Sequence, residues 1–146
     1  MENPLLATDG LPSFKKIKPE HVVPAIKQIL QENRESLKKL LAQPSQPSWN
    51  TLVEPLDINE DRLSRAWSPV RHLNSVTNSP ELREVYNQCL PMLSEYGTEM
   101  GQNKALFDAY QSIVDSPNYA SLDQAQKKVL DNTLREFRLS GVDLDN

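Results

Sequence analysis

Few residues in this chain could act as metal ligands or carry protons in a reaction. The 146-residue sequence has two histidines, His21 and His72, and one cysteine, Cys89. Neither histidine belongs to an H-E-x-x-H motif, which places two imidazoles and a carboxylate on one helical turn for zinc-dependent hydrolysis. A zinc site here would need carboxylates to complete it, so we predict that both histidines are ordinary hydrogen-bonded or partly exposed side chains.

An acidic run offers the second candidate for metal binding. Asp57-Ile58-Asn59-Glu60-Asp61 has the D-x-N-x-D opening of a calcium-binding loop. Such a loop also needs glycine at its sixth position and a bidentate glutamate at its twelfth, where this chain has Arg62 and Ser68. We therefore predict a solvated acidic stretch that follows a bend at Pro55.

The remaining reactive or binding groups have simpler interpretations. Cys89 falls on an apolar helical face without a nearby histidine, so a buried small side chain is expected rather than a nucleophile. The four glycines are scattered and form neither a phosphate-binding loop nor G-x-S-x-G. Most of the larger aromatic side chains share faces with aliphatic residues, which favours core packing over a peptide-binding surface: Trp49, Trp67, Tyr86, Phe107, Tyr110 and Phe137. We assign no catalytic, cofactor-binding or metal-binding residue to this sequence.

Composition excludes several classes of protein. At this length one domain can bury roughly 68–70% of its unfolded surface, so a single core is expected. The formal net charge of -4, without a lysine or arginine stripe, disfavours nucleic acid as a partner. The sequence has neither the roughly 18 consecutive apolar residues of a membrane span nor a basic, apolar signal peptide at its start. One cysteine allows no internal disulfide, so we expect a cytoplasmic protein.

Apolar residues recur in steps of three and four, which predicts helices to hold these groups in place. The first helix begins at Pro19 and ends before Pro44, with Pro24 about one turn in. Ser48 caps a second helix that reaches almost to Asn78. Pro55 and Pro69 interrupt this segment, which is expected to be one helix bent twice, with two or three separate helices as the alternative.

Three further helices follow. Ser79 caps the third, which has Pro80 at its first position and a bend expected at Pro91. Asn103 caps a short fourth helix that ends in the turn at residues 115–118. The capping-box pattern of residues 121–124 opens the fifth, and Gly141 ends it.

These elements predict an all-α fold, an irregular antiparallel bundle of about five long helices, some bent at prolines. Residues 1–18 form an extended lead-in anchored by Leu11, Phe14 and Ile17, and residues 19–146 form the helical domain. No segment alternates as a strand would, so no sheet is expected. Residues 141–146 resume an apolar–polar pattern, from which we expect a piece of a longer protein.

The amino-acid sequence resembles the N-terminal region of the thimet-oligopeptidase-like zinc metallopeptidases. The similar stretches run through most of the chain: residues 14–26, 48–49, 67–84, 125–132, 134–137 and 139–141. The resemblance implies a much longer, mostly helical enzyme in which two lobes flank a deep channel. There, a zinc ion held by H-E-x-x-H and a further glutamate would hydrolyse short unfolded peptides.

By this resemblance the chain is the N-terminal lobe, which walls the substrate channel and is inactive alone. The zinc ligands and the catalytic base would belong to the remainder of the same enzyme chain, its expected partner. A self-contained helical adaptor that binds partner helices or peptides in an amphipathic groove is the alternative. The two hypotheses differ in whether several hundred residues, including H-E-x-x-H, follow Asn146.

Overall fold

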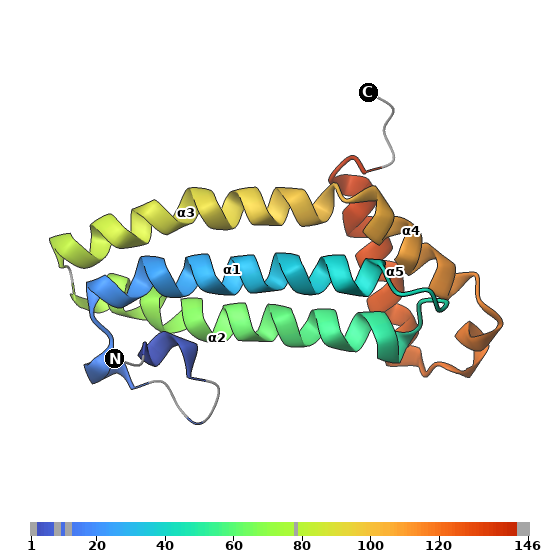
Figure 1. Ribbon diagram of the computed structural model, residues 1–146, viewed down its shortest axis with the longest axis horizontal. Coiled ribbons are helices and arrows are strands. Elements are labelled where there is room, and N and C mark those ends of the chain that lie inside the picture. Colours follow the sequence, from blue (N-terminus) through green and yellow to red (C-terminus); the bar gives the residue numbers. More distant parts are fainter. Residues whose placement is uncertain (1–2, 8–9, 11–12, 78, 143–146) are drawn as a thin grey trace.

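The structure, a computed structural model, describes all residues except 1–2, 8–9, 11–12, 78 and 143–146. The described residues form five α-helices and no strand, which confirms the predicted all-α class. The helices are α1 (Pro19–Leu41), α2 (Glu54–Thr77), α3 (Pro80–Gly101), α4 (Lys104–Val114) and α5 (Gln124–Leu139). Figure 1 shows α1, α2 and α3 side by side in alternating directions, with α4 and α5 across one end.

A first hydrophobic cluster joins the three long helices. On α1, Val22, Ile26 and Ile29 are fully buried at helical spacing. They pack against α2 and α3 in a cluster that also holds Leu5, Ala25, Leu30, Leu63, Ala66, Val70, Leu82, Cys89 and Tyr96. Burial of these faces is therefore what aligns the three helices.

A second hydrophobic cluster lies at the end where α4 and α5 cross. It combines aliphatic and aromatic side chains: Leu37, Leu52, Val53, Leu56, Leu106, Phe107, Tyr110, Ile113, Leu130, Leu134, Phe137 and Val142. Met100, near the end of α3, packs against both clusters. The two clusters are thus linked through α1, α2 and Met100.

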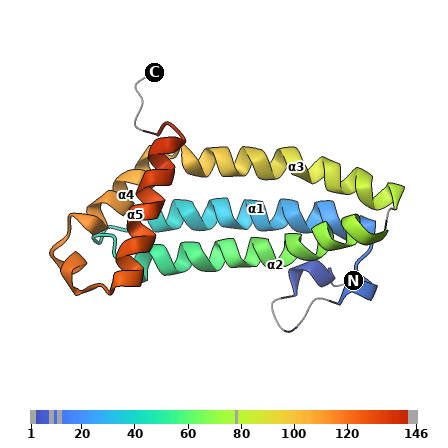
Figure 2. The same ribbon diagram turned by 180° about the vertical axis from the view of Figure 1, so that it is seen from behind.

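No helix is broken at Pro24, Pro55, Pro69 or Pro91. Residues Trp49–Val53 form a π-helical turn, η3, that leads directly into α2, so residues 49–77 are one continuous helical segment. The wide turn lets the Glu54 N–H donate to the Trp49 carbonyl, and Pro55 then enters the first turn of α2, where a missing N–H costs little. Pro69 and Pro91 lie inside α2 and α3, and α3 changes direction along its length (Figure 2).

Helix ends follow the predicted capping residues with one exception. The side chains of Ser79 and Asn103 accept hydrogen bonds from backbone N–H groups in the first turns of α3 and α4. The fifth helix is capped by Asp123, not by Ser121, and Asp123 and Gln126 form the reciprocal pair of a capping box. The prediction was wrong because Ser121 ends a separate 3-10 turn, η4 (Pro117–Ser121), where its hydroxyl donates to the Asn118 carbonyl.

Gly141 ends α5 as predicted. Its φ of 86° lies in the left-handed region that favours glycine. The Val142 N–H donates to the Phe137 carbonyl at 3.2 Å, and the Gly141 N–H donates to Arg138 at 3.0 Å. This pair of bonds is the Schellman arrangement, and it buries Val142 against the second cluster.

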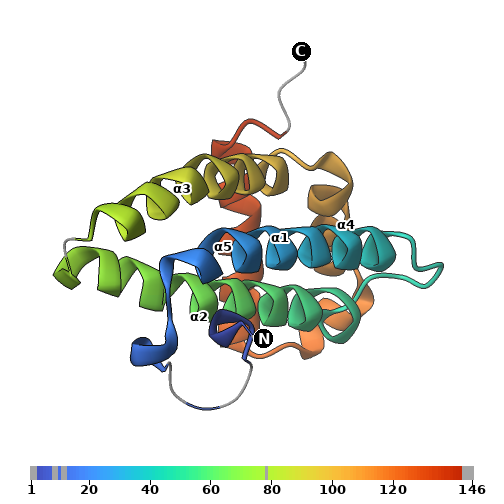
Figure 3. The ribbon, with the colours of Figure 1, turned by 60° about the vertical axis from the view of Figure 1, so that its left-hand side comes forward.

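The lead-in forms two short 3-10 turns, η1 (Pro4–Leu6) and η2 (Phe14–Lys16). Leu5 provides the buried anchor, since η1 packs against α1 and α2 (Figure 3). Of the predicted anchors, Ile17 packs on the first cluster and Leu11 lies outside the described residues. Phe14 is 40% exposed, but its ring lies 5.4 Å from the ring of His72 in α2, so it contacts a helix as predicted.

Candidate functional site

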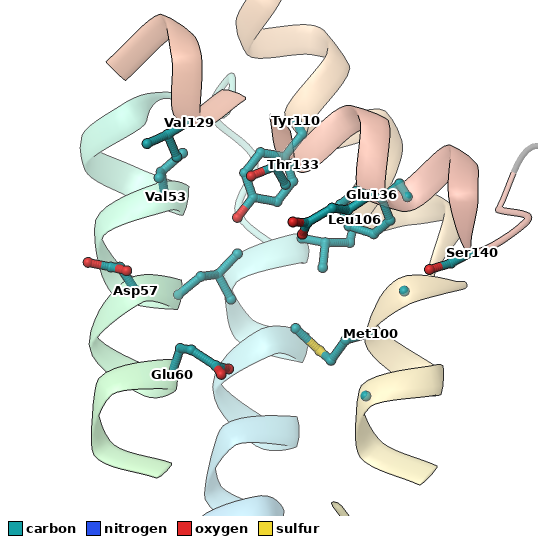
Figure 4. A pocket seen from close by; sticks show the side chains of 14 residues that line it. Val53, Asp57, Glu60, Met100, Leu106, Tyr110, Val129, Thr133, Glu136 and Ser140 are labelled. Atoms are coloured by element: carbon teal, nitrogen blue, oxygen red, sulfur yellow. The ribbon is translucent and has the colours of Figure 1, made fainter. Parts of the chain in front are cut away.

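A groove of about 400 Å³ opens where α5 crosses α2 and α3 (Figure 4). It is lined by side chains from four helices, and its apolar surface is built from the edge of the second hydrophobic cluster. Carboxylates and hydroxyl groups lie between these apolar residues. Polar groups from several helices therefore converge here on an apolar hollow.

Helical spacing explains which residues reach the groove from α2 and from the η3 turn that leads into it. Val53, Leu56, Asp57 and Glu60 are three or four positions apart, so they share one face. Val53 and Leu56 are buried in the second cluster, whereas Asp57 and Glu60 are exposed at its edge. The face thus passes from apolar to acidic along the helix, as Figure 4 shows.

Two glycines shape the α3 side. A Cβ built on Gly101 would lie 2.9 Å from the Oγ of Ser140, so the absence of a side chain lets α3 and α5 approach closely. A Cβ built on Gly97 would meet nothing within 4 Å, so this part of the wall is open. From α5, Thr133 and Glu136 face the groove.

The groove is negatively charged. Its three ionisable carboxyl groups belong to Asp57, Glu60 and Glu136, and no lysine, arginine or histidine is among the lining residues. None of these carboxylates forms an ion pair within the described part of the chain; the cross-helix pairs there are Arg62 with Glu32 and Arg34 with Glu99. The charge of the groove is therefore not neutralised by neighbouring helices.

Tyr110 of α4 is the most strongly perturbed group in the groove. Burial, and second the charge of Asp57, raises the pKa of Tyr110 to about 12, so the phenol stays protonated at neutral pH. Its side chain is 8% exposed, and its hydroxyl points into the groove (Figure 4). Apolar contacts, a buried hydroxyl donor and three carboxylates suit this groove to binding a cationic, partly apolar group.

The residues with metal-binding types of side chain do not lie together in the described part of the chain. The Nδ1 atom of His21 accepts a hydrogen bond from the Lys18 N–H at 3.0 Å in the first turn of α1. The ring of His72, in α2, lies 5.4 Å from the ring of Phe14. Among the described residues no three histidine, cysteine, aspartate or glutamate side chains form a group able to hold a metal ion.

The acidic run is helical rather than a loop. Residues 57–61 all lie within α2, so their side chains point around the helix and cannot enclose an ion together. Asp57 and Glu60 face the groove, whereas Asp61 lies 3.8 Å from Arg65 in an exposed ion pair. Asn59 turns the opposite way and donates to Ser36 of α1 at 2.9 Å.

Cys89 and the aromatic residues have the packing roles predicted for them. Cys89 is fully buried, and burial raises the pKa of its thiol to about 11, which removes the thiolate needed of a nucleophile. Trp67 stacks on Tyr86 with ring centres 4.9 Å apart. Phe137 contacts the rings of Phe107 and Tyr110 at 5.7 and 5.8 Å.

Sequence reasoning missed the groove itself. Tyr110 was predicted to lie in the core and residues 57–61 to be solvated. Tyr110 is indeed buried, and most of residues 57–61 are exposed, but Tyr110, Asp57 and Glu60 also line the groove. The available signal was the mixed face of α2, where apolar Val53 and Leu56 share helical spacing with Asp57 and Glu60. Which helix crosses that face depends on tertiary packing, which the spacing does not give.

The chain matches a known protein family. Residues 26–146 match the model of the family described as Neurolysin/Thimet oligopeptidase, N-terminal domain. Within the described residues no helix is both long enough and apolar enough to cross a membrane.

Curated relatives cover nearly the whole chain. Oligopeptidase A of Haemophilus influenzae is 51% identical over 144 residues, and oligopeptidase A of Escherichia coli is 52% identical over 144 residues. A probable cytosolic oligopeptidase A of Arabidopsis thaliana is 35% identical over 144 residues. Each alignment covers 99% of this chain but only 20–21% of the relative, so the chain spans about a fifth of the length of these proteins.

Proposed function

Because the chain belongs to the neurolysin/thimet oligopeptidase N-terminal domain family, we propose that it forms the N-terminal, channel-forming part of a zinc-dependent oligopeptidase. The observation that carries the proposal is the match itself, at 51–52% identity over 99% of the chain and 21% of the bacterial relatives. An alignment that covers almost all of this chain but about a fifth of each relative is expected if the chain is the first part of a larger peptidase. The remainder of the enzyme is then its principal partner.

The described residues of this chain do not fit a zinc site. The two histidines lie in different helices with other contacts, and the only cysteine is a buried thiol with a raised pKa. In the proposed enzyme the zinc ion and its ligands belong to the remainder of the chain. This part contributes no catalytic residue and is inactive alone.

We propose that this part of the enzyme contributes a structural wall rather than reactive groups. Helix α1 has 23 residues, which corresponds to roughly 35 Å at about 1.5 Å per residue. Three such helices packed around one core give an elongated bundle, which is suited to form one wall of a channel. A narrow channel admits short unfolded peptides and excludes folded proteins before any bond is broken.

We also place the enzyme in the cytoplasm. The single cysteine is reduced and buried, as is common in a reducing compartment. One plant relative is named as a probable cytosolic enzyme. Fractionation of the source cells, with the enzyme followed by antibody, would test this location.

The experiment that tests the proposal compares two products of the gene. Sequencing beyond codon 146 should show several hundred further codons including H-E-x-x-H. The complete product should cleave an internally quenched peptide of about ten residues, whereas the 146-residue chain at equal concentration should not. Cleavage by the 146-residue chain, about one tightly bound zinc per chain in metal analysis, or a stop codon directly after residue 146 would each contradict the proposal.

A helical adaptor remains the second candidate, because the groove beside α5 has the mixed apolar and charged lining of a helix-binding surface. The two candidates give opposite results in the same gene sequence. A stop codon near position 146 supports the adaptor, and a downstream H-E-x-x-H motif supports the peptidase.

A further inference from the structure

The groove between α2, α3, α4 and α5 has the properties of a docking site for a second helix. Its volume of about 400 Å³ is large enough for a few side chains, not for a folded partner. The apolar surface does not stop at the groove: Val129 at its edge is 45% exposed, and Ile58 on the adjoining face of α2 is 68% exposed. Apolar side chains that flank a hollow in this way suit a partner with an apolar stripe.

The negative charge of the groove indicates which charged side chains the partner carries. Asp57, Glu60 and Glu136 come from two helices that face each other across the hollow, and no cation from the described chain pairs with them. Asp61, which pairs with Arg65, lies beside Asp57 and Glu60 on α2. Potentials at interfaces are complementary, so the matching surface carries lysine or arginine.

Tyr110 adds a hydrogen-bonding group to the groove. The residue is 8% exposed, and its hydroxyl points into the groove (Figure 4). A phenol hydroxyl can donate a hydrogen bond to, or accept one from, a polar group of a docked partner.

Gly97 makes close approach possible. Of the two α3 glycines in the groove wall, it is the one at which an added Cβ would meet nothing within 4 Å. A helix lying across this position could bring its backbone near α3 without a clash. Ser140, at the last turn of α5, lies at the same groove, so chain that continues after α5 in a longer enzyme starts beside it.

From these observations we infer that the groove binds an amphipathic helix bearing lysine or arginine, contributed by the remainder of the same enzyme. The inference rests on the proposed function for the origin of the helix. The cationic and amphipathic chemistry rests on the groove alone. The two parts are therefore tested separately.

The chemistry is tested with the 146-residue chain. An 18-residue capped peptide of leucine and lysine, with the lysines on one helical face, is titrated into ¹⁵N-labelled chain. We expect chemical-shift changes centred on Gly97, Gly101 and Thr133, and Kd about tenfold higher for the variant Asp57→Asn/Glu60→Gln/Glu136→Gln, because it loses the three attracting charges. The matched control, Glu35→Gln/Glu84→Gln/Glu95→Gln, loses the same charge away from the groove and should change Kd less than about threefold.

The variant Gly97→Leu tests whether peptide binding requires the groove to be open at position 97. The new side chain enters open space on a helix, so the fold should persist in the amide spectrum while the groove is filled and peptide binding falls about tenfold or more. Equal binding of a peptide with glutamate in place of lysine, or shift changes centred away from the groove, would overturn the inference.

The origin of the helix is tested in the complete enzyme. Benzoylphenylalanine placed at position 97 should crosslink, on irradiation, to a later segment of the same chain that carries lysine or arginine, whereas the probe at position 84 should not. Crosslinking to an added peptide substrate instead would refute the inferred occupant but leave the peptidase proposal standing. Absence of any downstream coding sequence would refute the proposed function, while the peptide titration would still decide the chemistry of the groove.

Discussion

The three-helix region and the region where α4 and α5 cross are built in different ways. In the first, mostly aliphatic side chains of three aligned antiparallel helices interlock, and Val22, Ile26, Ile29 and Val70 are completely buried. In the second, aliphatic and aromatic side chains together fill the space between crossing helices, most core residues stay 2–8% exposed, and a groove opens beside them. Aligned helices can close a core, whereas crossed helices leave an edge that another surface can cover.

The largest expected effect tests whether the first core is the more rigid one. Ile26→Ala should lower the free energy of unfolding by about 4–5 kcal/mol, because the closed cluster cannot collapse around the cavity. Phe137→Ala removes a larger side chain yet should cost only about 3 kcal/mol, because its site adjoins the groove and water can enter. Urea denaturation followed by circular dichroism measures both.

Each region also contains a tryptophan that reports on it. Trp67 packs on the first cluster and Trp49 on the second. Since α1, α2 and Met100 contribute to both clusters, the variants Trp49→Phe and Trp67→Phe should unfold at the same urea concentration when followed by the remaining tryptophan. A lower urea midpoint reported by Trp49 than by Trp67 would contradict the single unfolding transition. A smaller loss of unfolding free energy for Ile26→Ala than for Phe137→Ala would contradict the greater rigidity of the first core.

The sequence predicted the first region better than the second, for a physical reason. Spacing located the buried face of α1, and residue type located the cap of α3 at Ser79, since both depend on neighbours along the chain. It left open the helix breaks at prolines and missed the groove, because both depend on packing. Tyr110 is part of the core through its ring and part of the groove through its hydroxyl, a division that periodicity cannot show.

Alkaline pH gives the next largest effect and separates the regions by chemistry. Burial raises the pKa of Cys89, in the first cluster, from 9.0 to about 11. Burial and the charge of Asp57 raise the pKa of Tyr110, in the second, from 10.0 to about 12. In both cases the unfolded chain loses its proton at lower pH than the folded chain. The stability is present below the unfolded pKa and is lost as pH rises through the folded value.

Each shift corresponds to roughly 2–3 kcal/mol. In the Cys89→Ala variant, stability should therefore decrease less steeply between pH 9 and about 11 than in the parent chain. In the Tyr110→Phe variant, it should decrease less steeply between pH 10 and about 12. Urea midpoints at half-unit pH steps, expressed as differences from the parent chain, isolate these groups from other titrations. Parallel pH profiles for parent and variant would show that the burial of that group is not what opposes its ionisation.

The smallest expected effect concerns the ion pairs on the surface of each region. Arg34 of α1 and Glu99 of α3 form a two-bond pair, at 2.9 and 3.2 Å, across the three-helix region. Lys104 and Asp108 lie 3.3 Å apart within α4 and are 67% and 60% exposed. A double-mutant cycle with Arg34→Met and Glu99→Gln should give a coupling energy of about 0.5–1 kcal/mol, since both hydrogen bonds join separate helices.

The corresponding cycle with Lys104→Met and Asp108→Asn should give about 0.2–0.5 kcal/mol, because a one-bond pair one turn apart is largely solvated. Arg34 also lies over the Tyr96 ring at 5.6 Å, but that contact is lost in the single and the double variant alike, so it cancels in the coupling term. Both couplings should shrink in 1 M salt. If the Lys104–Asp108 coupling equals or exceeds that of Arg34–Glu99, then surface pairing does not follow the division between aligned and crossed helices that separates the two cores.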